Sequence, residues 1–140
     1  MPLSLPRRRR SLPADLVPVH EAFERCAAHV DLAQRAMIRC VPSSPRSLAL
    51  PLEVGAQTVR AALADARAGM PAWRHESVEP HWQACSNAID ATLAGLAPAI
   101  GTAQATTELE VALTAVQDLL DPLHAFVDAE EAFGRLRRRP

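Results

Sequence analysis

A heptad spacing of apolar side chains near the start of the chain is the feature that most constrains its fold. The apolar positions follow one another in alternating steps of three and four residues: Leu16, Val19, Phe23, Cys26, Val30, Ala33, Met37 and Cys40. Such a seam gives a helix one narrow apolar stripe, which is buried only when other helices lie along it. The spacing therefore predicts a first helix from about Ala14 to Arg39 within a bundle of helices.

Two further segments repeat this rhythm and predict the second and third helices. The second runs from Pro51 to Gly69, and the third runs from an N-cap at Ser77 to an end at Gly101. A serine N-cap accepts a hydrogen bond from the first turn, and glycine often follows the last turn of a helix. Most of the 49% hydrophobic residues are Ala and Leu, which are strong helix formers. With no alternating run typical of a strand, the sequence indicates an all-α fold.

A fourth helix is predicted to begin with a capping box at Thr107 and to carry a broad apolar face. Pro122 lies in the middle of this segment, where a proline removes one backbone hydrogen bond. Either the helix kinks there, or it ends and Asp121 caps a separate fifth helix from Pro122 to Arg137. Because short connections favour antiparallel neighbours, we expect an up-down-up-down four-helix bundle with a Pro-kinked last helix.

Charge is segregated along the chain. Every basic side chain is an Arg, and eight of the 15 lie at the two ends: Arg7, Arg8, Arg9, Arg10, Arg135, Arg137, Arg138 and Arg139. Residues 11–134 contain all 16 acidic residues and carry a formal charge of −9. We expect a disordered basic tail over residues 1–13, a bundle domain over residues 14–134 and a second basic tail over residues 135–140. In a bundle with an even number of helices, both tails leave from the same pole.

The two Arg clusters have two interpretations. Clustered Arg side chains neutralise phosphate groups, so they could bind nucleic acid or another polyanion. However, the acidic body repels a duplex, and no aromatic residues interleave the arginines to stack on bases. We favour tails that are solvated or that dock onto an acidic partner, such as the body of a second copy.

Histidine and carboxylate residues that share helix faces give a candidate metal site. Asp121, His124 and Asp128 share one face of the last helix, and His20 and Glu24 share a face of the first. Helical bundles build metal sites from such residues, often as Glu-x-x-His pairs. The chain contains no such pair, so solvent-facing histidines paired with carboxylates are the simpler interpretation. We expect no cofactor, with a bound transition metal as the alternative.

Five residues are predicted to contact a partner protein: Trp73, Arg74, Leu119, Phe126 and Phe133. The broad apolar face of the last helix indicates either the most buried helix of the bundle or one that meets another chain. Trp73 lies in a linker beside Arg74, and an exposed tryptophan is a typical interaction hot spot. The alternative for Trp73 is that it closes the end of the core.

The cysteines predict buried, reduced thiols. Cys26, Cys40 and Cys85 are too few and too widely spaced for a disulfide framework or a zinc motif. Reduced thiols are typical of the cytoplasm. A nucleophilic Cys85 activated by His81, four residues earlier, is the alternative to core packing.

These features together favour binding over catalysis. No window approaches about eighteen uninterrupted apolar residues, so we expect no membrane span. We expect a non-catalytic interaction or assembly protein that forms homo-oligomers in the cytoplasm. The alternatives are a bundle that binds a metal or small ligand, with oxidoreductase activity as one outcome, and a nucleic-acid accessory protein that uses the Arg clusters.

Overall fold

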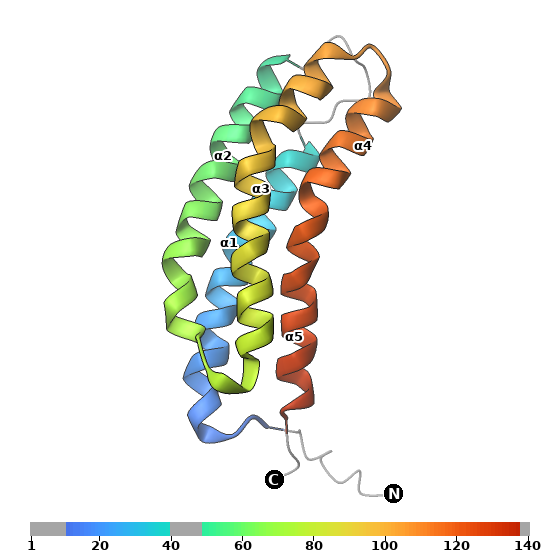
Figure 1. Cartoon of the computed structure of the whole chain (residues 1–140). Coiled ribbons are helices and arrows are strands. Elements are labelled where there is room, and N and C mark those ends of the chain that lie inside the picture. Colours follow the sequence, from blue (N-terminus) through green and yellow to red (C-terminus); the bar gives the residue numbers. More distant parts are fainter. Residues whose placement is uncertain (1–10, 40–48, 138–140) are drawn as a thin grey trace, which may run out of the picture.

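Four rods of helix lie side by side, which confirms the predicted all-α four-helix bundle (Figure 1). This computed structural model describes residues 11–39 and 49–137. The first three rods are α1 (Val17–Arg39), α2 (Ala49–Gly69) and α3 (Glu79–Ala105). The fourth rod consists of two helices, α4 (Leu109–Leu120) and α5 (Ala125–Arg135). No β-strand occurs within the two described ranges.

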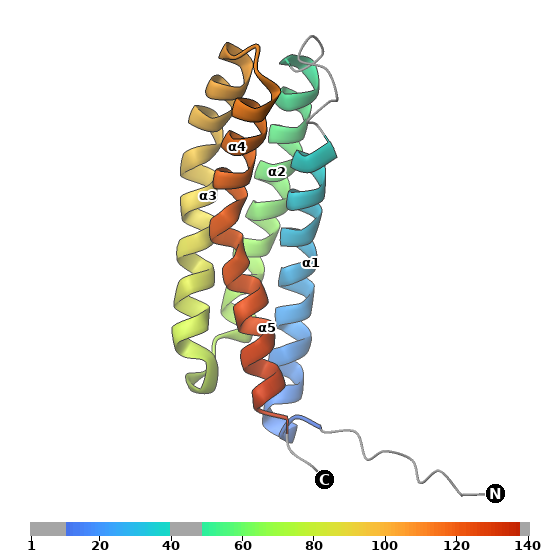
Figure 2. The same cartoon turned by 90° about the vertical axis from the view of Figure 1, so that its right-hand side faces the viewer.

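The rods alternate in direction along a common axis in both views (Figures 1 and 2). The described chain therefore begins and ends at the same pole, where the start of α1 and the end of α5 lie close together. α1 packs most extensively against α2, and α3 against α4, whereas α1 and α4 make few contacts. α1 therefore packs less closely against α4 than against α2.

The heptad stripe of α1 forms one side of the core. Its described members are buried, apart from the partly buried Val19: Leu16, Phe23, Cys26, Val30, Ala33 and Met37. Burying each larger side chain of this kind contributes about 1.5–3 kcal/mol relative to leaving it exposed. Cys40, the last position of the stripe, lies outside the described residues.

Several helix ends differ from the predicted ones, and α2 begins at Ala49 rather than at Pro51. α3 continues past Gly101 to Ala105, because one glycine costs a helix only about 1 kcal/mol. α3 begins at Glu79 without a side-chain cap, so Ser77 does not cap it. The His75 imidazole instead caps the preceding 3-10 segment, Glu76–Val78, with Nδ1 accepting a hydrogen bond from the Ser77 N–H at 3.0 Å. α4 begins at Leu109 and has no side-chain cap, so the capping box predicted at Thr107 is wrong.

Pro122 lies in a short 3-10 segment, Asp121–His124, that joins α4 to α5. The segment has tighter i to i+3 bonding, which accommodates the missing proline N–H without a loop. α5 then begins at Ala125 without a side-chain cap, so Asp121 does not cap a fifth helix that starts at Pro122.

An aromatic cluster fills the core near the pole where the chain begins and ends. It consists of His20, Phe23, Trp73, Phe126 and Phe133. The Phe23 ring centroid lies 4.9 Å from that of Trp73, edge to face, and 5.1 Å from that of Phe133. Aromatic pairs in such arrangements contribute about 0.5–1.5 kcal/mol beyond the area they bury. The cluster thus joins three parts of the fold. These are α1, the segment Met70–Trp73 that follows α2, and α5.

Candidate functional site

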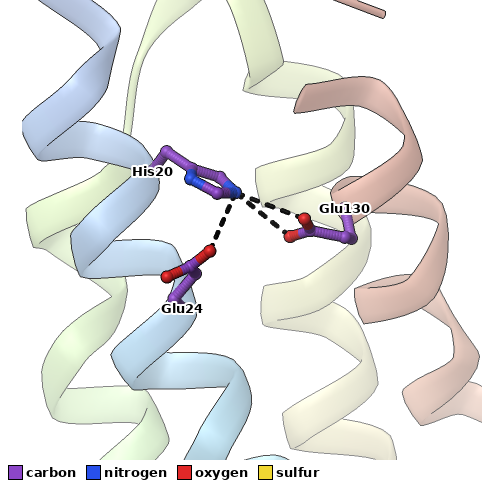
Figure 3. A group of neighbouring side chains, drawn as sticks. All are labelled: His20, Glu24 and Glu130. Carbon is purple, nitrogen blue, oxygen red and sulfur yellow. Dashed lines mark hydrogen bonds and ion pairs between the residues drawn. The ribbon is translucent and has the colours of Figure 1, made fainter. Parts of the chain in front are cut away.

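A histidine and two glutamates meet where α1 faces α5. His20 Nε2 lies 3.5 Å from Glu24 Oε1 and 3.2 Å from Glu130 Oε2. The two carboxylates approach the same ring nitrogen from different helices (Figure 3). We call these three residues the His20 triad; one ligand atom from each lies within 4.8 Å of the other two.

Local structure explains how the triad forms. His20 and Glu24 are four residues apart on α1, which places them on the same helix face. The His20 side chain is 8% exposed, and its ring centroid lies 4.9 Å from that of Phe133. The aromatic cluster thus fixes the imidazole, and Nε2 is turned toward the solvent side. The Glu24 and Glu130 side chains are 60% and 52% exposed, so the triad is open to water on that side.

The structure brings together only part of the metal site predicted from the sequence. His20 and Glu24 lie together as expected, but the third member of the site is Glu130, which was not predicted from the sequence. Neither α1 nor α5 alone indicates this partner, because the contact depends on how two helices 110 residues apart are aligned.

The other three predicted ligands lie apart from the His20 triad. His124 Nε2 is 3.8 Å from Asp128 Oδ1 on the exposed face of α5. Asp121 is exposed in the 3-10 segment before that helix. The interpretation of His124 as a solvent-facing histidine paired with a carboxylate agrees with this arrangement.

A groove of about 980 Å³ lies between α1 and α4 and extends to the start of α5. Its apolar lining includes the exposed residues Ile38, Leu113 and Val127, which are 61%, 37% and 49% exposed. We call this feature the α1–α4 groove. It lies where α1 and α4 make few contacts.

Acidic side chains surround this groove. Asp31, Asp118 and Asp121 line it, together with Arg35 and His124. Arg35 Nε lies 2.9 Å from Asp31 Oδ2 one turn earlier, so this Arg neutralises the negative charge of one of the three carboxylates. The groove therefore combines exposed aliphatic contact area with a net negative rim.

Four of the five predicted partner-binding residues belong to the core instead. Trp73 and Phe133 are fully buried, and Leu119 and Phe126 are 6% and 5% exposed. The bundle itself buries these side chains, and their predicted contact with a partner stays a prediction. Trp73 closes one end of the core, which was the alternative interpretation of this residue.

Arg74, the fifth predicted contact residue, is exposed and held by its own chain. Its guanidinium donates to Glu79 Oε1 at 2.6 Å, and its Cζ lies 4.1 Å from the Trp82 ring centroid. Hydrogen bonds from Arg74 and then Gln83 lower the pKa of the Glu79 carboxyl. The same ion pair raises the pKa of Arg74.

The two described cysteines are buried thiols. Burial raises the pKa of Cys26, and the neighbouring Trp73 indole N–H lowers it by less. Burial raises the pKa of Cys85 to about 12, with smaller contributions from Cys26 and Asp128. A thiol that stays protonated near neutral pH is a poor nucleophile. Both side chains instead fill the core.

Only two residues of the predicted Arg clusters can be placed. Arg135 and Arg137 are exposed at the end of α5, and Arg135 lies 3.8 Å from Glu131. Arg7, Arg8, Arg9, Arg10, Arg138 and Arg139 lie outside the described residues. Their predicted contact with a polyanion therefore stays a prediction.

None of the helices in residues 11–39 and 49–137 combines the length and apolarity that a membrane crossing requires. Comparison with protein families, with curated proteins and with solved structures found no match.

Proposed function

We propose that this protein is a non-catalytic assembly module that pairs with a second copy of itself through the α1–α4 groove. The observation that carries the proposal is the exposed aliphatic lining of that groove, where α1 and α4 make few contacts. Contiguous exposed apolar surface in a helical protein favours burial against another chain.

The lining residues support a protein partner. Ile38, Leu113 and Val127 come from three different helices and converge on one groove. Each exposes between about a third and two thirds of its surface. Burying such area against a partner contributes about 25 cal/mol per Å² before the costs of association are subtracted.

Two-fold symmetry explains how a second copy can cover the groove. In a two-fold antiparallel pair, the same patch of both copies meets its counterpart. The apolar lining of one groove then packs against the same lining of the other. The two acidic rims also face each other, so the apolar contacts carry the association against their repulsion. The exposed Arg135 and Arg137 lie outside the groove lining, at the pole where the described chain begins and ends.

Light scattering over a range of protein concentrations tests the proposal. We expect twice the mass of one chain, falling to a single chain in the double variant Ile38→Ser/Leu113→Ser. The matched control is Leu32→Ser/Val54→Ser, because these residues are 52% and 57% exposed but do not line the groove. This control should keep the dimer.

Ionic strength provides a second measurement. Salt should screen the repulsion between the two acidic rims, which include Asp118 and Asp121, because a Debye length shrinks to about 3 Å at 1 M. The dimer should therefore become tighter as the ionic strength rises. A strictly monomeric wild-type protein would overturn the proposal. Equal loss of the dimer in both double variants would show that the α1–α4 groove is not the interface.

A further inference from the structure

We infer that the His20 triad is a binding site for a divalent transition-metal ion of the Zn²⁺ type, which would link α1 to α5. The inference rests on His20, Glu24 and Glu130 alone and is independent of the α1–α4 groove. It concerns a ligand rather than a protein partner, so it extends beyond the proposed function.

The spacing of the donor atoms fits such an ion. In a tetrahedral site with bonds of about 2.0–2.2 Å, neighbouring ligand atoms are about 3.3–3.5 Å apart. His20 Nε2 lies 3.5 Å from Glu24 Oε1 and 3.2 Å and 3.3 Å from the two carboxylate oxygens of Glu130. The nitrogen therefore already stands near the separation that a shared ion imposes from each carboxylate, and one oxygen of each carboxylate lies within 4.8 Å of the other (Figure 3).

The surroundings favour a metal over a loose surface contact. The His20 ring is held against Phe133 and Phe23, so its donor nitrogen loses little rotational freedom on binding. The two carboxylates are half exposed, which gives an ion a path from solvent and leaves room for water as the fourth ligand. Three protein ligands and one open position are typical of zinc sites that keep a water.

The donor set indicates the class of ion. One imidazole nitrogen and two carboxylates suit Zn²⁺ and its first-row neighbours, whereas Mg²⁺ and Ca²⁺ prefer a full shell of oxygen ligands. Direct hydrogen bonding of the His20 ring to the two carboxylates is the competing explanation for the same distances, and it predicts no metal binding.

Titration calorimetry of the chelator-treated full chain with zinc chloride separates these explanations. At mildly alkaline pH we expect one Zn²⁺ per chain. We expect Glu130→Gln and Glu24→Gln each to weaken binding by at least about 10-fold, because each removes one charged ligand. Both glutamates are exposed, so these variants should fold, and circular dichroism checks that they do.

A matched control comes from α5. The double variant His124→Gln/Asp128→Asn removes a second exposed His–carboxylate pair, at 3.8 Å, and should leave Zn²⁺ affinity unchanged. Zn²⁺ should also raise the melting temperature of the wild type but not of Glu130→Gln, because an ion that binds only the folded state stabilises it.

Three results would overturn the inference. They are no saturable Zn²⁺ binding, binding that persists unchanged in Glu130→Gln, and binding that disappears in the α5 control. The light-scattering experiment on the α1–α4 groove has no bearing on these outcomes, so the two proposals fail separately.

Discussion

The Thr92 hydroxyl donates a hydrogen bond to the backbone carbonyl of Leu119 at 3.3 Å, within the buried contact between α3 and α4. Thr92 itself is fully buried. Leu119 lies in the last turn of α4, next to the 3-10 segment that contains Pro122. Carbonyl groups at a helix end lack some of their helical donors, so a side chain from a neighbouring helix supplies one here.

Replacing Thr92 with Val should therefore destabilise the fold by about 1–3 kcal/mol, although the two side chains have nearly the same shape. The cost arises because the Leu119 carbonyl stays buried without this donor. Urea unfolding measures the effect. Thr92→Ser keeps the hydroxyl, so a Ser variant as unstable as the Val variant would show that the methyl group, not the hydrogen bond, matters.

Trp73 should tolerate replacement by Phe far better than by Ala. Its indole N–H has no conventional hydrogen-bond partner among the described residues and lies near the weakly accepting Cys26 sulfur. Trp73→Phe removes this buried donor and keeps an aromatic ring against Phe23, so we expect a loss below about 1–2 kcal/mol. Trp73→Ala empties the site and should cost about 3–5 kcal/mol. Equal losses in urea unfolding would contradict this account.

Stability should fall at alkaline pH because of the buried thiols. The folded pKa of Cys85 is raised to about 12, against about 8.5 for an unperturbed thiol. The unfolded chain therefore loses this proton first. The contribution is complete below about pH 8.5 and is lost as the pH rises toward the folded value, at up to about 1.4 kcal/mol per pH unit.

Urea unfolding between about pH 8 and pH 10 tests this prediction. Cys85→Ala should flatten the dependence but not abolish it, because burial also raises the pKa of Cys26. An unchanged slope in Cys85→Ala would assign the alkaline loss to other groups. Slow alkylation of the native thiols compared with the unfolded ones is a second expected outcome.

Gly101→Ala should stabilise the protein by about 0.5–1 kcal/mol. Gly101 lies inside α3, and a Cβ atom added there meets nothing within 4 Å. Alanine therefore reduces the entropy of the unfolded chain without a clash. In the control Gly95→Ala the new Cβ lies 3.4 Å from Leu119 Cδ1, so the gain should be smaller. Thermal unfolding compares the two, and a larger gain at Gly95 would contradict the explanation.

The heptad spacing predicted the bundle because burial of a stripe depends mainly on periodicity. It placed Phe23 and Val30 in the core correctly, and α1 ends at Arg39 as expected. Local signals were less reliable at helix ends. Favourable packing of α3 outweighs the modest cost of Gly101, so the helix continues where the sequence indicated a stop.

The candidate sites were predictable only in part. An apolar face on the last helix indicates that its side chains are buried, but it does not indicate against which surface. Phe126 and Phe133 pack within their own chain. His20 and Glu24 share a face through helical periodicity, which sequence shows. Glu130 joins them through the alignment of two distant helices, which no local pattern encodes.

The aromatic cluster has a consequence for synthesis of the chain. Phe23 is synthesised before Phe126 and Phe133, which pack against it. Until α5 has been made, the apolar surface that these two residues will cover is a hazard for aggregation. A premature stop codon just before α5 would thus yield a product in which Phe23 lacks both of these partners.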